Sequence, residues 1–145
     1  MHHHLILRVV AKLFLPFILL FALYVQWHGD YGPGGGFQAG VIFAVGFILY
    51  ALVYGVDALV KVVPVKILVI GMTAGLLIYA GTGVVALFTG VDYLDYSHLA
   101  HDPVHGQEWG ILFVELGVGI AVASAMTAIF VAFSTREADI DDEDW

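Results

Sequence analysis

Long apolar runs alternate with short polar connections along the whole chain. The four runs extend over residues 5–27, 37–56, 67–91 and 109–133, with approximate ends. An α-helix rises about 1.5 Å per residue and the hydrocarbon core of a bilayer is about 30 Å thick, so roughly 20 apolar residues are enough to cross it. The pattern therefore predicts an all-α integral membrane protein, with four transmembrane helices in a single domain over residues 1–145.

The first run is the weakest of the four, because Arg8 and Lys12 lie near its start and Pro16 follows. A cleavable signal peptide is the alternative, since such peptides also begin with basic residues. No small-residue cleavage site follows, however, and Tyr24 and Trp27 are typical of an anchor at the membrane interface. We expect a retained helix.

The composition agrees with a membrane protein and excludes several other classes. Hydrophobic residues make up 61% of the chain and charged residues 12%, against roughly 45–50% and about 25% in soluble domains. Gly34, Gly36 and Ala39 match the glycine pattern of dinucleotide sites, but that pattern has meaning only within a soluble βαβ unit. The absence of cysteine excludes disulfides, zinc–thiolate sites and iron–sulfur ligation by this chain. We expect no cofactor and no nucleic-acid partner.

The basic residues predict the orientation in the membrane. They are Arg8, Lys12, Lys61, Lys66 and Arg136. The connections at 28–36 and 92–108 contain no Lys or Arg, so the positive-inside rule places both termini and the 57–66 turn in the cytoplasm. Residues 136–145 form an acidic cytoplasmic tail, which is either a solvated end or a docking segment for a partner.

The connection between the first two runs, "GDYGPGGGFQAG" at 29–40, is unusually rich in glycine. Gly36 and Gly40 have the G-x-x-x-G spacing that suits close helix contact in lipid. Gln38 is a polar side chain that needs a partner if it is buried. The preferred interpretation is a close-packed turn and helix entrance, formed by Gly34, Gly35, Gly36, Phe37, Gln38 and Gly40. A loop that lines an ion or water path is the alternative.

The second outer connection carries several titratable side chains. They are His98, His101 and His105, with Glu108 and nearby aspartates. His98 and His101 could share one face of a helical turn and ligate a divalent metal, but Pro103 interrupts any continuous helix there. We expect no metal site. An ordinary solvated loop between subunits is favoured over a surface that exchanges protons at the mouth of a path.

Glu115 is the single charged residue inside the fourth run. It follows Trp109 by six residues, hence by about 9 Å along a helix. An ionised carboxylate within the membrane costs at least roughly 2.5–3.5 kcal/mol, so it should face protein or water. Because no basic residue lies near that depth, we expect any counter-charge to come from another subunit or from a transported ion. A proton or cation relay is favoured over a protonated side chain that makes one interhelical hydrogen bond.

Two segments resemble a known family. "PGGGFQAGVIFA" is similar to the signature of the B subunit of Mrp-type multi-subunit sodium/proton antiporters, the MnhB family. "HGQEWGILFVELGVGIAV", which contains Glu115, Gly117 and Gly119, resembles the family's second characteristic segment. The resemblance implies a small subunit of a monovalent cation/proton antiporter in the cell membrane, which supports sodium tolerance and pH homeostasis. It implies a transporter subunit rather than an enzyme, with large antiporter-like subunits as partners and the sodium ion and proton as transported species.

This chain lacks the run of intramembrane lysines and glutamates of the large subunits, so it should not be a complete antiporter by itself. The alternative is a membrane-arm subunit of a redox complex, such as an ion-pumping hydrogenase related to respiratory complex I. A scaffold subunit is a third interpretation. The motifs do not separate these relatives.

Overall fold

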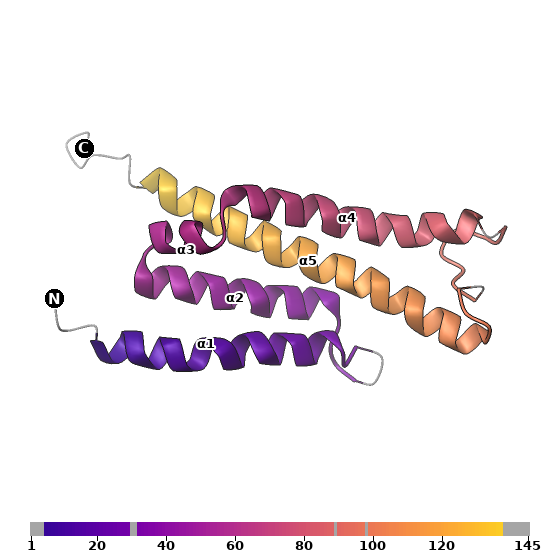
Figure 1. Ribbon diagram of the computed structural model, residues 1–145, viewed down its shortest axis with the longest axis horizontal. Coiled ribbons are helices and arrows are strands. Elements are labelled where there is room, and N and C mark those ends of the chain that lie inside the picture. Colours follow the sequence, from indigo (N-terminus) through magenta and orange to yellow (C-terminus); the bar gives the residue numbers. More distant parts are fainter. Residues whose placement is uncertain (1–4, 30–31, 89, 98, 138–145) are drawn as a thin grey trace.

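The computed structural model describes residues 5–29, 32–88, 90–97 and 99–137, and its regular secondary structure there is all α-helical. The helices are α1 (Leu5–Gln26), α2 (Gly36–Tyr54), α3 (Val56–Val62), α4 (Val65–Phe88) and α5 (Pro103–Glu137) (Figure 1). Within the described ranges, four helices are long and apolar enough to cross a membrane: α1, α2, α4 and the Pro103–Thr135 part of α5. The all-α fold with four membrane-compatible helices is thus confirmed.

The second apolar run divides at a glycine. Gly55 has φ of +98°, a conformation that residues with a side chain rarely adopt, and its N–H closes the last turn of α2 on the carbonyl of Ala51 at 2.7 Å. The chain then turns into the short α3, with Asp57 in the first turn and Lys61 in the last. At these positions each charge interacts favourably with the helix dipole. The continuous helix is therefore shorter than the run predicted at 37–56, because the hydrophobic pattern does not change at the turn.

The last helix starts six residues before the predicted span of 109–133. Pro103 is its first residue, a position at which the N–H of a helix has no partner and proline is well tolerated. A side-chain oxygen of Asp102 accepts the N–H of Val104 at 3.2 Å and caps the helix. Pro103 thus opens a helix, and His105 and Glu108, expected in a loop, lie in its first two turns.

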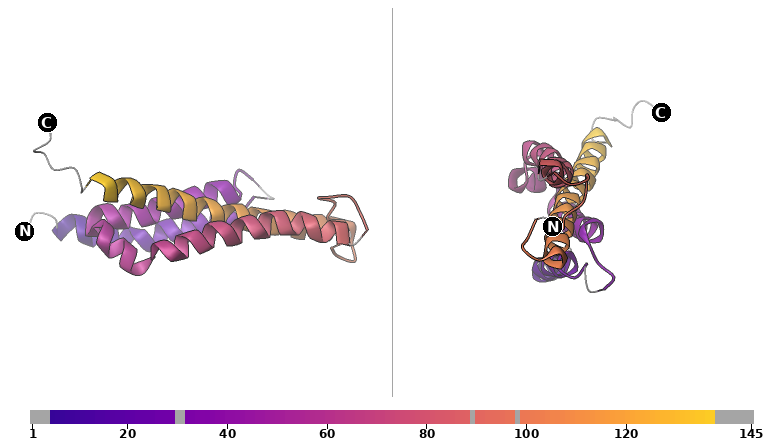
Figure 2. Two further views of the ribbon diagram at one scale, coloured as in Figure 1. Left: turned by 90° about the horizontal axis from the view of Figure 1, so that it is seen from above. Right: turned by 90° about the vertical axis from the view of Figure 1, so that its right-hand side faces the viewer.

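α5 lies between α2 and α4, while α1 packs mainly against α2 (Figures 1 and 2). The start of α1, the whole of α3, the start of α4 and the end of α5 lie at one end of the bundle (Figure 1). The five basic residues belong to these parts of the chain, so the structure gathers them at one end. The α1–α2 and α4–α5 connections lie toward the other end.

The two hairpins differ in reach. The hairpin of α4 and α5 extends well beyond the α1–α2 connection (Figure 1). This connection therefore meets α5 part-way along its length, twelve residues or about 18 Å after Pro103, where Glu115 lies.

Glycines bring the helices into main-chain contact. A Cβ atom built at Gly75 of α4 would lie 2.6 Å from the carbonyl oxygen of Gly117 on α5, and one at Gly40 of α2 would lie 2.7 Å from that of Gly119. Helices surrounded by lipid gain little from apolar contact with one another, so close packing of small residues contributes much of their association. At the basic end, α3 is fixed by a cluster of Ala51, Leu59 and Val131.

Candidate functional site

The carboxylate of Glu115 lies against the glycine-rich connection. A Cβ atom built at Gly29 would lie 2.6 Å from Oε2 and 2.7 Å from Oε1 of Glu115, and one at Gly35 would lie 2.9 Å from Oε1. The Glu115 side chain is partly buried as a result. The two segments that carry the family resemblance, far apart in the sequence, therefore meet at one carboxylate.

Hydrogen bonds to the end of α1 hold the connection in this place. The carbonyl of Val25 accepts the N–H groups of His28 at 3.3 Å and of Gly35 at 3.2 Å, and the N–H of Gly32 bonds to the carbonyl of His28 at 3.1 Å. Gly35 has φ of +124°, so its lack of a side chain permits both the turn and the approach of Glu115. The connection thus folds back on α1 and presents main chain to α5.

The entrance of α2 makes the tightest contact of the site. A Cβ atom at Gly36 would overlap the main-chain carbonyl of Glu115, so only glycine fits there. Phe37 and Gln38 next to it point outward and are exposed, Phe37 by 61%. The expectation that Gln38 would need a buried partner therefore does not apply.

The structure adds two facts about the surroundings of Glu115. Glu115 takes part in a polar interaction within its own chain, in addition to its contacts with Gly29 and Gly35. Through these contacts it also lies level with the α1–α2 connection, and the α4–α5 hairpin extends farther along the bundle than this connection does (Figure 1). The sequence could not show either fact, because both depend on where the first hairpin ends relative to α5.

Gln26 at the end of α1 belongs to the same neighbourhood and was missed by the sequence analysis. The residue is buried, with 6% of its surface exposed, and its Oε1 lies 2.6 Å from the place of a Cβ atom at Gly119. A glutamine at the end of an otherwise apolar run was the available signal, because such a side chain must find polar partners.

The titratable side chains predicted to lie in the second connection do not gather around Glu115. Nδ1 of His105 lies 3.2 Å from Oδ2 of Asp102, one helical turn away, and both side chains are exposed. His101 and Glu108 are exposed as well, and His98 lies outside the described residues. In the described part of the chain, no group of three or more His, Cys, Asp or Glu side chains is placed to hold a metal ion.

The α4–α5 connection is organised by Asp95 and Tyr96 instead. Oδ1 of Asp95 accepts hydrogen bonds from the N–H of Ser97 at 3.0 Å, from the hydroxyl of Ser97 at 2.6 Å and from the side-chain amide of Gln107 at 3.4 Å. Tyr96 is buried against Gly110, and burial raises the pKa of its phenol, as do the neighbouring phenols of Tyr93 and Tyr79. These contacts fasten the loop to the start of α5.

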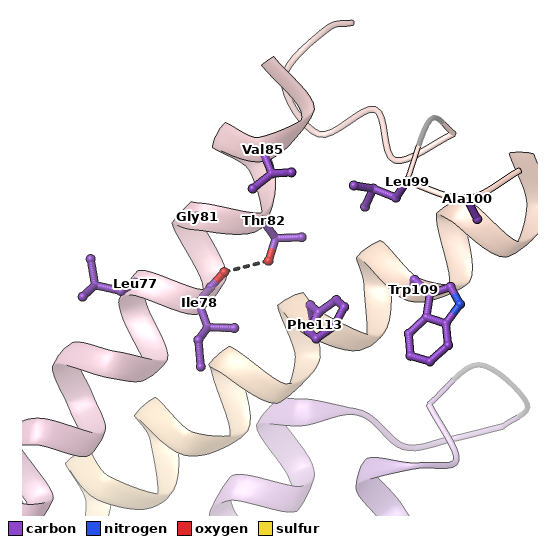
Figure 3. A pocket seen from close by; sticks show the side chains of 9 residues that line it. All are labelled: Leu77, Ile78, Gly81, Thr82, Val85, Leu99, Ala100, Trp109 and Phe113. Atoms are coloured by element: carbon purple, nitrogen blue, oxygen red, sulfur yellow. Dashed lines mark hydrogen bonds between the residues drawn. The ribbon is translucent and has the colours of Figure 1, made fainter. Parts of the chain in front are cut away.

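A separate cavity of about 550 Å³ lies between α4 and α5, in the halves of these helices that adjoin their connection (Figure 3). Apolar side chains such as Ile78, Val85, Trp109 and Phe113 line it. The hydroxyl of Thr82 donates to the carbonyl of Ile78 at 2.7 Å, as the dashed line in Figure 3 shows. The cavity thus offers apolar contact rather than acid–base chemistry.

Comparisons with known proteins show which family the chain matches. Residues 6–128 match the family model described as the domain related to the MnhB subunit of Na+/H+ antiporter. The chain is 33% identical over 132 residues to a Staphylococcus aureus (strain Newman) protein with the name "Putative antiporter subunit mnhB2", and the match covers 84% of this chain and 93% of that protein. A protein of the same name from Staphylococcus haemolyticus is also 33% identical over 132 residues, with 89% and 93% covered. The chain therefore belongs to the MnhB family of subunits of Mrp-type Na+/H+ antiporters.

Proposed function

We propose that this chain is a cell-membrane subunit of a monovalent cation/proton antiporter, in which Glu115 takes part in the ion path and the glycine-rich connection holds the subunit together. One observation carries the proposal. The chain belongs to a family of antiporter subunits, and the single acid within its last apolar run lies against the main chain of the glycine-rich segment.

The chemistry of a carboxylate suits this role. Its oxygens can bind a monovalent cation or a proton, and an ionised group inside a membrane is expensive enough that it is usually functional. Glu115 precedes the basic end of α5 at Arg136 by 21 residues, hence by about 32 Å, close to the thickness of the hydrocarbon core. We infer that Glu115 lies near one face of that layer, where it can exchange protons or cations with water.

The proposal includes the orientation that the basic residues predict. We expect a cysteine at His101 to react with an impermeant thiol reagent added outside intact cells, and a cysteine at Lys61 to stay unlabelled until the cells are opened. The native side chains of His101 and Lys61 are exposed, and the two residues belong to opposite ends of the bundle. The native chain contains no cysteine, so only the introduced one can react. External labelling of Lys61→Cys in intact cells would show that the orientation is the opposite of the one proposed.

Purification of the intact complex tests the function itself. We expect this chain, carrying an affinity tag, to recover large antiporter-like membrane subunits, and vesicles containing the complex to show sodium-dependent proton exchange. Recovery of iron–sulfur or nickel proteins in place of these subunits would favour the redox alternative and contradict the proposal.

A further inference from the structure

A cavity of about 310 Å³ lies between α1, α2 and α3, and its wall is almost wholly apolar. Leu19 of α1, Phe47 of α2 and Leu59 of α3 contribute to this wall. Leu59 is buried, whereas Val62, which also lines the cavity, is 62% exposed, so the cavity opens on the surface of the bundle. Because lipid tails are as apolar as leucine, such a cavity in a membrane helix bundle can accept a hydrocarbon chain.

Two basic side chains share the face of α1 that lines the cavity. Arg8 and Lys12 are followed by the wall residues Leu15 and Leu19 at spacings of four, three and four residues, so the four side chains form one stripe along the helix. The start of α1 lies at the basic end of the bundle (Figure 1). The two positive charges are therefore placed at the end of the stripe that is nearer the membrane surface, and the apolar wall is placed deeper.

Two tyrosines connect Arg8 to the cavity. Cζ of Arg8 lies 5.9 Å from the centroid of the Tyr54 ring, and the Tyr54 hydroxyl donates to the carbonyl of Arg8 at 2.8 Å. The ring centroids of Tyr54 and Tyr50 are 4.8 Å apart, and Tyr50 is part of the cavity wall. A guanidinium that stacks on an aromatic ring keeps its N–H groups available in the plane for other acceptors. Arg8 is thus held beside the cavity with donors to offer.

The two charges lack an anion in the described part of the chain. Arg8 and Lys12 are one helical turn apart, and like charges at this spacing destabilise a helix. Neither side chain forms an ion pair with any residue that the structure describes. A phosphate bound between them would remove the repulsion, because guanidinium and ammonium groups donate strong hydrogen bonds to its oxygens.

We propose that the groove between α1, α2 and α3 binds one anionic phospholipid, with the headgroup phosphate between Arg8 and Lys12 and one acyl chain in the apolar cavity. Basic pockets between transmembrane helices are a common way to bind anionic headgroups. A free phosphate or an acidic peptide would match the charges but would leave the apolar wall without an occupant. The inference depends neither on Glu115 nor on the proposed transport activity.

A photoactivatable lipid tests the site directly. The purified complex that contains this chain is reconstituted in phosphatidylcholine bilayers with a small fraction of phosphatidylglycerol that carries a diazirine in the upper part of one acyl chain. A matched sample receives phosphatidylcholine with the same diazirine chain. After irradiation, peptide mass spectrometry locates the labelled residues. We expect the phosphatidylglycerol probe to label Leu15, Leu19 and Phe47 at least about fivefold more than the phosphatidylcholine probe, because two basic side chains attract the anionic headgroup.

Three variants separate the contributions of charge and cavity. Arg8→Gln combined with Lys12→Gln should bring the labelling by the two probes close to equal. Lys66→Gln, the matched control, removes one exposed charge from the start of α4, which packs against α5, and should leave the difference unchanged. Val62→Phe keeps every charge and narrows the cavity, so it should lower labelling of the wall severalfold. It decides the question if the loss of two basic residues prevents correct insertion of the chain.

Equal labelling of the wall by both probes in the unmodified complex would mean ordinary contact with the bilayer and would overturn the proposal. No labelling by either probe would mean that protein covers the cavity, and would overturn it too. Selective labelling that appears only after deletion of the acidic segment 138–145 would show that this segment occupies the charges instead. Labelling does not measure ion exchange, so a failure here is distinct from a failure of the proposed antiport function.

Discussion

Replacing Glu115 with Gln should leave a complex that assembles but no longer exchanges sodium for protons. The amide keeps the shape of the side chain and its contacts with Gly29 and Gly35, but it neither releases a proton nor carries a charge. We expect the exchange rate in everted vesicles, followed by a pH-sensitive dye, to fall more than about tenfold, which corresponds to about 1.4 kcal/mol at the barrier. Glu115→Asp should retain part of the activity with a shifted pH profile.

Glu108→Gln is the matched control. Glu108 lies on the same helix, seven residues or about 10 Å earlier, and its side chain is exposed. The Glu108→Gln substitution removes one negative charge from α5 and leaves the contacts with the glycine-rich connection unchanged. The exchange rate should therefore stay near that of the unmodified complex. If Glu115→Gln exchanges normally across the pH range, the residue serves packing alone and the relay is wrong.

Replacing Gly36 with Ala should sharply reduce the yield of complete complex. The added Cβ atom would overlap the main-chain carbonyl of Glu115, and neither backbone can move without separating α2 from α5. Overpacking of this kind costs about 1–3 kcal/mol, and more where main chain must move. The yield is measured by purifying the complex at equal expression, and Gly36→Leu should lower it further.

Gly81→Ala on α4 provides the comparison for a glycine that makes no close contact. No atom of the described structure lies within 4 Å of its expected Cβ atom, so alanine should be tolerated and should even favour the helix by about 0.5–1 kcal/mol. Normal assembly of Gly36→Ala would contradict the packing argument. Normal assembly with lost exchange would instead assign the connection a direct part in the ion path.

The four apolar helices could be predicted from the sequence because membrane crossing depends on the length and hydrophobicity of each segment alone. The helix boundaries were less predictable. Gly55 ends α2 through its backbone conformation, and Pro103 starts α5 in a polar segment; neither event changes the apolar pattern strongly. Similarly, Glu115 could be selected as a candidate because a charge within an apolar run is costly wherever it occurs.

The sequence by itself determined the fold class and the placement of the basic residues at alternate ends of the apolar runs. It also indicated the family, through two segments that resemble the family's motifs. Only the tertiary structure brought those motifs together at Glu115, and only it showed the burial of Gln26 and the cavity between α1, α2 and α3. The physical reason is that helix contacts depend on the register between helices. Register is set by many small main-chain contacts, such as those of Gly36, Gly40 and Gly75, which no single segment of the sequence specifies.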